Sequence, residues 1–148
     1  MQRKNFDEMT CPIARTLDRV GEWWSILILR DAFFGRTRFD EFQKSTGIAP
    51  NILTRRLKSL VEAGLLEKRP YQERPVRYEY LLTEMGRNTQ PLLIALSDFG
   101  NRYFADRGVT MQVRDIATGD VAAPVYIDEK TGKTIDPEGY SIRSVRQR

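Results

Sequence analysis

The chain has 148 residues, 41% hydrophobic and 30% charged, a balance typical of one globular domain with at most a small appendage. It contains no histidine and one cysteine, which excludes most catalytic and metal chemistry and any internal disulfide, so we expect no enzyme activity and no cofactor. The longest apolar stretch is too short to span a membrane and the first ten residues contain no signal-peptide pattern, so we expect a cytoplasmic protein.

Positive charge is concentrated in the middle of the chain. The formal net charge is +4, but residues 36–77 contain ten Lys or Arg against five Asp or Glu. The remainder holds 14 basic and 15 acidic residues and is close to neutral. Such a basic segment is either a solvated surface or a surface that meets the phosphates of a nucleic acid.

Two helices are predicted in the first part of the chain. Proline suits the first helical position, so Cys11-Pro12 opens a helix that reaches about Val20 and is ended by Gly21. The second helix runs from about Glu22 to Phe33 and is apolar on nearly all sides. That composition predicts a central core helix.

A short third helix and a fourth helix follow, joined by a turn. Phe39 and Phe42 lie three residues apart on the third helix, and the sequence Ser-Thr-Gly ends it. Ile48 can anchor the turn to the core, and Ala49 or Pro50 begins the fourth helix. This spacing is typical of a helix-turn-helix, although a plain helical hairpin has the same pattern.

The fourth helix has one apolar face and one polar face on a helical wheel. The apolar stripe consists of Leu53, Leu57, Leu60 and Val61. The opposite face carries Asn51, Arg55 and Lys58, with Thr54 and Arg56 on its flanks. In a major groove, arginine suits guanine and asparagine suits adenine; the alternative is a face that is only solvated.

A β-hairpin is predicted after Gly64, which ends the fourth helix. Residues 65–72 and 76–82 form its strands, with a turn at residues 73–75. A hairpin directly after a helix-turn-helix is a wing. Its tip would reach the neighbouring minor groove or the DNA backbone through Arg74, with Arg77 and Lys68 near the base, and plain solvation of these arginines is the alternative.

A last long helix begins after Thr83, and Pro91 should kink or restart it. Its apolar ridge consists of Leu92, Leu96, Phe99 and Tyr103. Because the earlier helices already supply a core, we interpret the ridge as a dimer surface, with packing inside the same chain as the alternative.

From residue 109 onward, short apolar pieces are separated by turn sequences such as ATGD and DPEG, which predicts small β-hairpins. The expected fold is mainly α with a small β wing, a winged helix-turn-helix with a short β-rich C-terminal appendage. We assign residues 1–108 to DNA binding and dimerisation, and residues 109–148 to an appendage without an assigned role.

The segments CPIARTLDRVGEWWSILILRDAFFG, RFDEF, GIAPNILTRRLKSLVEAGLLEKR and VRYEYLLTEMGR, in this order, resemble the HxlR-type winged helix-turn-helix transcriptional regulators of bacteria. The similarity covers about residues 11–105. It implies a homodimer held by its first and last helices, so Ile13 and Leu17 join the ridge in the expected interface. It also implies that each subunit places residues 50–63 in a major groove of near-palindromic double-stranded DNA.

The expected DNA contacts combine the recognition helix, the wing and the loop before the third helix. They are Arg36, Pro50, Asn51, Thr54, Arg55, Arg56, Lys58, Lys68, Arg74 and Arg77. The alternative function is a protein-interaction module on the same scaffold, which has lost DNA contact and docks through its tail.

Cys11 matches a cysteine that in some relatives of the HxlR type senses electrophiles or oxidants. A thiol at a helix N-terminus lies at the positive end of the helix dipole, which favours the thiolate. Without a second cysteine, oxidation would give a sulfenic acid, a small-thiol adduct or a bridge between subunits. The alternative is a small buried residue at the helix start.

A small-molecule effector is a further candidate partner. An apolar pocket near Trp23, Trp24, Phe99 and Tyr103 could hold one, although such residues more often form plain core.

Overall fold

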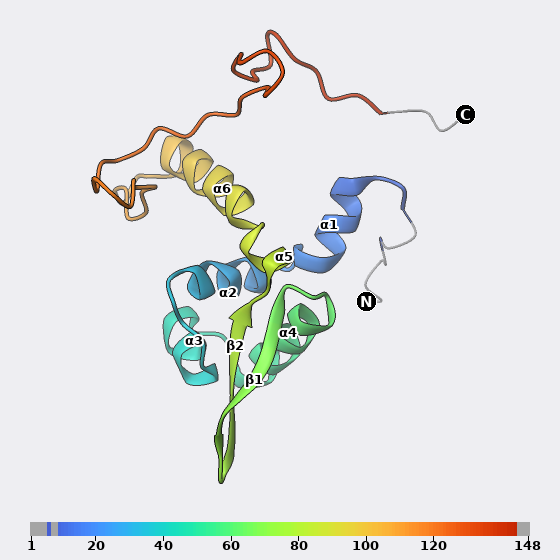
Figure 1. Ribbon diagram of the computed structural model, residues 1–148, viewed down its shortest axis with the longest axis vertical. Helices are drawn as coiled ribbons and strands as arrows, with labels where there is room; N and C mark the ends of the chain where they lie inside the picture. Colours follow the sequence, from blue (N-terminus) through green and yellow to red (C-terminus); the bar gives the residue numbers. More distant parts are fainter. Residues whose placement is uncertain (1–5, 7–8, 145–148) are drawn as a thin grey trace. The chain divides into compact units, whose positions relative to one another are not determined.

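The computed structural model describes residue 6 and residues 9–144, which form six helices and one two-stranded antiparallel sheet (Figure 1). The chain divides into two compact units, residues 1–93 and residues 94–148, and each is described by itself. No helix in the described residues is long and apolar enough to cross a membrane. The elements are α1 (Pro12–Val20), α2 (Trp23–Phe33), α3 (Phe39–Thr46), α4 (Pro50–Glu62), β1 (Leu66–Glu73), β2 (Val76–Leu82), α5 (Glu84–Arg87) and α6 (Gln90–Tyr103).

The helices begin where the local signals in the sequence predict. An extended residue followed by proline starts both α1, at Cys11-Pro12, and α4, at Ala49-Pro50. The proline ring lacks an N–H group that the first helical position would leave unpaired in any case. The predicted restart near Pro91 is confirmed, because α5 and α6 are separate helices. Thr83 caps α5, where its Oγ1 accepts a hydrogen bond from the Gly86 backbone N–H at 3.0 Å.

The core of the first unit lies between α2, α3, α4 and the start of β1. Ile28 and Leu29 of α2 and Phe42 of α3 are completely buried. The predicted apolar stripe of α4 is confirmed at three of its positions, which are also completely buried: Leu53, Leu57 and Leu60. Full burial of each such side chain contributes about 1.5–3 kcal/mol. The outward face of α4 is therefore fixed by the packing of the inward one.

Helix α2 is central, as predicted, but its faces differ from the prediction. Trp23 is 76% exposed, so the described residues leave the start of the helix uncovered. Asp31, in contrast, is completely buried. Its Oδ1 accepts hydrogen bonds from Nε and Nη2 of Arg30, at 3.0 and 2.8 Å, and lies 3.4 Å from Nη1 of Arg36. This charged cluster joins the end of α2 to the loop that leads into α3.

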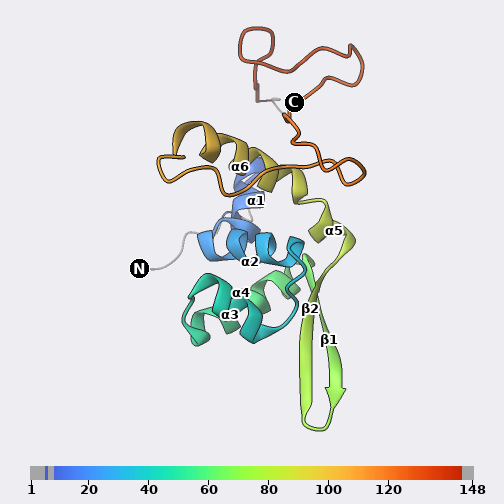
Figure 2. The same cartoon turned by 90° about the vertical axis from the view of Figure 1, so that its left-hand side faces the viewer.

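The wing is a regular antiparallel hairpin. Its register runs from Leu66 opposite Leu82 to the pair next to the turn, with one bulge between Pro70 and Gln72. The hairpin projects beyond the helices in both views (Figures 1 and 2). The predicted alternation of β2 is wrong in its burial: Val76, Arg77 and Tyr78 near the tip are all exposed, and the next four residues are half-buried. Val76 is 54% exposed because the tip has no helix to pack against.

The second unit contains most of α6 and the C-terminal appendage. Two of the three predicted turns lie in short loops, each closed by one isolated antiparallel bridge, Arg114 with Val121 and Ile127 with Thr134. No bridge in the described residues spans the third turn, DPEG. The first loop is attached to α6, since Asn101 Nδ2 donates to the Met111 carbonyl at 2.9 Å.

Candidate nucleic-acid interface

The turn between α3 and α4 sets the angle at which the two helices meet. Gly47 has a φ of +70° and its N–H donates to the Gln43 carbonyl at 2.9 Å, which ends α3 in a left-handed cap. Glycine adopts this conformation without steric cost. Ile48, the next residue, is only 2% exposed and anchors the turn in the core, as predicted. The arrangement is a helix-turn-helix with α4 as its second helix.

The outer face of α4 is uncovered by the rest of the described chain. Asn51, Thr54, Arg55 and Lys58 are exposed, so the structure brings together the polar side chains that the helical wheel predicts. Thr54 Oγ1 donates to the Pro50 carbonyl at 2.9 Å, which leaves its lone pairs outward. Within the described residues, the side chains of Asn51 and Arg55 have no hydrogen-bond or ion-pair partner.

Three of the predicted contact residues lie close to carboxylates of their own chain. One of them, Lys58, stays solvated on α4, with its Nζ 3.8 Å from Glu62 Oε1. The other two are arginines. Arg56 is 19% exposed at its side chain, and its Nη1 lies 3.6 Å from Glu22 Oε1 at the start of α2. Arg36 reaches back to the buried Asp31. The guanidinium groups of Arg36 and Arg56 therefore lie apart from the exposed polar side chains of α4. Their ion pairs link neighbouring segments of the first unit instead.

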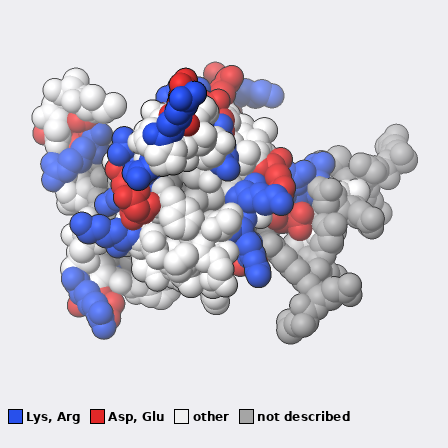
Figure 3. Space-filling model, turned by 90° about the horizontal axis from the view of Figure 1, so that it is seen from below, with Lys and Arg blue, Asp and Glu red and all other residues white. Residues whose placement is uncertain are grey.

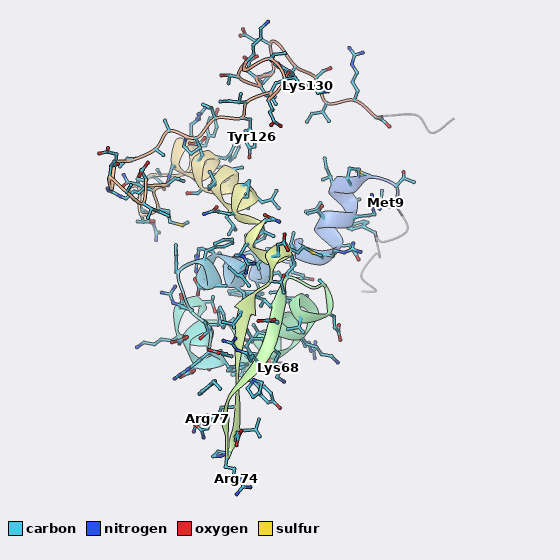
Figure 4. All side chains as sticks on the ribbon, in the orientation of Figure 1. Met9, Lys68, Arg74, Arg77, Tyr126 and Lys130 are labelled. Atoms are coloured by element: carbon cyan, nitrogen blue, oxygen red, sulfur yellow. The ribbon has the colours of Figure 1, made fainter. Side chains whose placement is uncertain are left out.

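The wing carries the remaining predicted contacts. Arg74 lies at its tip and Lys68 lies nearer the root, as predicted (Figure 4). Arg77 was expected near the base but is the second residue of β2, opposite Gln72 and close to the tip. Gln72 Nε2 donates to the carbonyls of Arg74 and Pro75, at 3.3 and 3.1 Å, and so ties the tip together. The Lys68 ammonium lies 4.2 Å from the centre of the Tyr78 ring.

The wing is joined to the start of α3 by backbone pairing. The Tyr80 N–H donates to the Thr37 carbonyl at 2.7 Å, and Arg38 forms an isolated antiparallel bridge with Glu79. Glu41 Oε2 accepts from the N–H groups of Thr37 and Arg38, at 2.9 Å each. These two hydrogen bonds, Thr37 first, hold the pKa of Glu41 below its ordinary value. The wing and α3 are thus positioned against each other.

Arg38 is a candidate contact that the sequence reasoning missed. Its guanidinium carbon lies 4.2 Å from the centre of the Tyr71 ring, at the bulge of β1 between Pro70 and Gln72. Arg38 belongs to the basic segment, but the sequence alone favours Arg36, two residues earlier, as the contact. The only available signal was its position immediately before α3, since the ring it contacts lies 33 residues away in the sequence.

Charges on the end of the molecule from which the wing projects are interspersed. Figure 3 shows Lys and Arg side chains around a largely uncharged centre, with Asp and Glu beside several of them. Positive charge therefore does not form one continuous patch on this face. Attraction of phosphates would come from separate side chains on α4 and the wing.

A helix-turn-helix whose second helix exposes a polar face, followed directly by a β-hairpin, defines the winged helix-turn-helix class of DNA-binding proteins. Residues 19–107 match the HxlR-like helix-turn-helix family, and the chain belongs to that family. The HTH-type transcriptional regulator Rv3095 of Mycobacterium tuberculosis is 38% identical over 132 residues, 85% of this chain and 84% of the relative.

Solved structures show the same fold. PA1607, a candidate transcription factor, aligns with a TM-score of 0.84 at 38% identity, over 95% of this chain and 99% of its own. The redox regulator HypR in its reduced form aligns with a TM-score of 0.59 at 31% identity, over 63% of this chain and 95% of its own. The first similarity extends into the C-terminal appendage, so the appendage is not peculiar to this chain.

Proposed function

We propose that the protein is a homodimeric transcriptional regulator that binds double-stranded DNA sequence-specifically, with α4 in a major groove. The observation that carries the proposal is the uncovered outer face of α4. Asn51 and Arg55 present amide and guanidinium groups that can form paired hydrogen bonds with adenine and guanine. Lys58 and Thr54 flank them, and the wing extends toward the neighbouring minor groove or backbone through Arg74 and Arg77.

A mobility-shift titration at two salt concentrations tests this function. The chain is titrated against a duplex enriched from a random-sequence pool, called here the selected duplex, and against an unrelated duplex of equal length. We expect tighter binding to the selected duplex, and a loss of affinity for both as salt rises, because phosphate contacts release counterions. Equal affinity for the two duplexes, or failure of enrichment, would instead favour a protein-interaction module.

Dimerisation is proposed through the exposed apolar side chains of α1 and α6. Ile13 and Leu17 of α1 are 60% and 48% exposed. On α6 the exposed ridge consists of Leu92, Leu96, Phe99 and Tyr103. Apolar side chains at this spacing, uncovered within the chain, fit an isologous contact with a second copy.

Replacing Phe99 by aspartate should convert the dimer into a monomer. Phe99 is 56% exposed and lies 4.9 Å from the Tyr103 ring, so the substitution leaves the core intact but buries a charge in the proposed interface. Light scattering should give twice 17.2 kDa for the parent and 17.2 kDa for Phe99→Asp. Ile116→Asp, at a fully exposed position in the appendage, is the matched control and should stay dimeric. A monomeric parent, or a dimeric Phe99→Asp, contradicts the proposal.

Cys11 is proposed as a thiol sensor. It is exposed at the start of α1, so the alternative of a buried small residue does not apply within the chain. The similarity to the redox regulator HypR supports a sensing role. We expect alkylation by iodoacetamide to weaken binding to the selected duplex, because a bulky adduct next to α1 disturbs the proposed dimer contact. Cys11→Ser should bind equally well with and without the reagent. Unchanged affinity of the alkylated parent would rule out the sensor.

A further inference from the structure

A groove of about 480 Å³ lies between the start of α3 and the wing. Arg38 and Asp40 line it on the α3 side. The wing contributes one arginine and three tyrosines: Tyr71, Arg77, Tyr78 and Tyr80. The groove lies wholly within the first unit, and its two sides are joined by the backbone pairing of Arg38 with Glu79.

The charges around the groove favour an anion. Neither Arg38 nor Arg77 forms an ion pair with a described carboxylate, whereas Arg69 on the same wing is paired with Glu79 at 3.0 Å. Asp40 supplies the single acidic side chain of the lining. Burial, followed by the effect of Tyr78, raises the pKa of Tyr80, so its hydroxyl stays neutral. Two unpaired guanidinium groups against one carboxylate leave a net positive site.

Arg38 is held in place before any ligand arrives. Its backbone N–H donates to the Glu41 carboxylate, and it forms a β-bridge with Glu79. These two contacts fix the backbone of Arg38. Its guanidinium lies 4.2 Å from the centre of the Tyr71 ring. Cation–π contact with a ring restricts the side chain while its N–H groups remain available for oxygen acceptors. An arginine restrained in this way loses less conformational entropy when it binds a phosphate.

We propose that this groove seats a backbone phosphate of bound DNA, with Arg38 as the donor and Tyr71 as the residue that positions it. The proposal rests on the proposed function and adds a contact outside the recognition helix. The duplex is the occupant because α3 belongs to the helix-turn-helix and Arg77 belongs to the wing, so both sides of the groove come from elements proposed to meet the same DNA.

The test measures affinity and its salt dependence for the full-length chain and four variants. Arg38→Ala should weaken binding to the selected and the unrelated duplex by the same factor, about three- to tenfold, because a phosphate contact carries no sequence information. The slope of log affinity against log salt should fall by about 1.8, because each of the two subunits loses one phosphate contact and each contact contributes about 0.9. Tyr71→Leu should show part of this loss, and Tyr71→Phe, which keeps the ring, should bind as the parent does. Arg69→Ala, on the same wing but outside the groove, is the matched control and should keep the parental slope.

A second measurement locates the phosphate. Single phosphates of the selected duplex are replaced in turn by uncharged methylphosphonates. Replacement at one position in each half of the duplex should weaken binding by the parent and leave binding by Arg38→Ala unaffected, because the two changes then remove the same contact. A position at which the parent and Arg38→Ala lose the same affinity is a contact of another residue. If no position weakens the parent alone, the proposal is overturned.

The outcomes separate this inference from the proposed function. If the parent prefers the selected duplex to the unrelated one but Arg38→Ala has the parental affinity and salt slope, only the proposed phosphate contact of Arg38 is wrong. A loss of affinity by Arg38→Ala for the selected duplex alone would also overturn the phosphate contact, since Arg38 would then contact a base. If the parent binds no duplex, the proposed function is wrong, and the phosphate contact that rests on it is wrong as well. Thermal melting of each variant verifies that it is folded.

Discussion

Replacing Arg55 by alanine is expected to lower affinity for the selected duplex by about 10- to 100-fold, or roughly 1–3 kcal/mol. Arg55 is exposed at the centre of the outer face of α4 and has no partner within the described residues. An arginine in that position can donate two hydrogen bonds to one guanine, and alanine can donate none. Affinity for an unrelated duplex should fall much less, because only the non-specific attraction of one charge is lost.

The control for Arg55→Ala removes an equal charge far from the helix-turn-helix in sequence. Lys133, in the second loop of the appendage, is exposed, and Lys133→Ala should leave the ratio of the two affinities unchanged. The fold should not be affected by either substitution, since both side chains are solvated. If Arg55→Ala keeps the parental ratio of affinities for the selected and the unrelated duplex, this face of α4 does not determine sequence specificity.

Replacing Asp31 by alanine is expected to destabilise the first unit by about 3 kcal/mol. Asp31 is completely buried and is the carboxylate that two arginines share, with Arg30 at 2.8 Å and Arg36 at 3.4 Å. Its removal leaves two guanidinium groups near the core without a counter-charge. The loss lies at the lower end of the range for buried pairs, because the arginine side chains are 26% and 38% exposed and keep part of their hydration.

Urea denaturation followed by tryptophan fluorescence measures this loss. Both tryptophans, Trp23 and Trp24, lie on α2, the helix that carries Asp31. A matched surface pair provides the control: Asp98 lies 3.6 Å from Arg102, and both side chains are largely solvated. Asp98→Ala should therefore cost less than about 0.5 kcal/mol. A free energy of unfolding for Asp31→Ala within 1 kcal/mol of the parent would show that the cluster contributes little.

Local signals in the sequence were enough to predict the elements of the first unit. Pro50 and Gly64 bracket α4, and the spacing of Leu53, Leu57 and Leu60 gives its buried face. Once this face of α4 is buried, the polar residues on the opposite side of the helix must face outward. These signals act within a few residues of each other, so no knowledge of the tertiary structure is needed.

Contacts between distant segments could not be predicted in the same way. The wheel places Arg56 at the flank of the polar face, but it does not show that Glu22 lies 3.6 Å from it. Arg36 and Arg38 are both basic residues in the loop before α3, and only the folded chain shows that one reaches Asp31 and the other Tyr71. Ion pairs and ring contacts of this kind depend on how the elements pack.

The appendage is intermediate between these cases. Its turn sequences predicted hairpins. ATGD and EKTGK each lie in a loop that a single bridge closes, whereas no bridge in the described residues closes a hairpin around DPEG. Ile116 is fully exposed, and none of the large apolar residues of the loops is buried. Turn chemistry fixes where the chain reverses, whereas the length of a strand depends on side chains that pack across it.

The central claim, that the outer face of α4 rests against a duplex, is tested most directly by site-directed DNA cleavage. Cys11 is first replaced by serine, and a single new cysteine carrying an iron chelate is placed at Asn51, at Arg74 or, as a control, at Lys133. We expect the reagent at Asn51 to cut the selected duplex in two clusters about 10 base pairs apart, one for each subunit. The reagent at Arg74 should cut the flanks, and the reagent at Lys133 should give no localised cuts. Diffuse cleavage from Asn51 that matches the Lys133 pattern would contradict the claim.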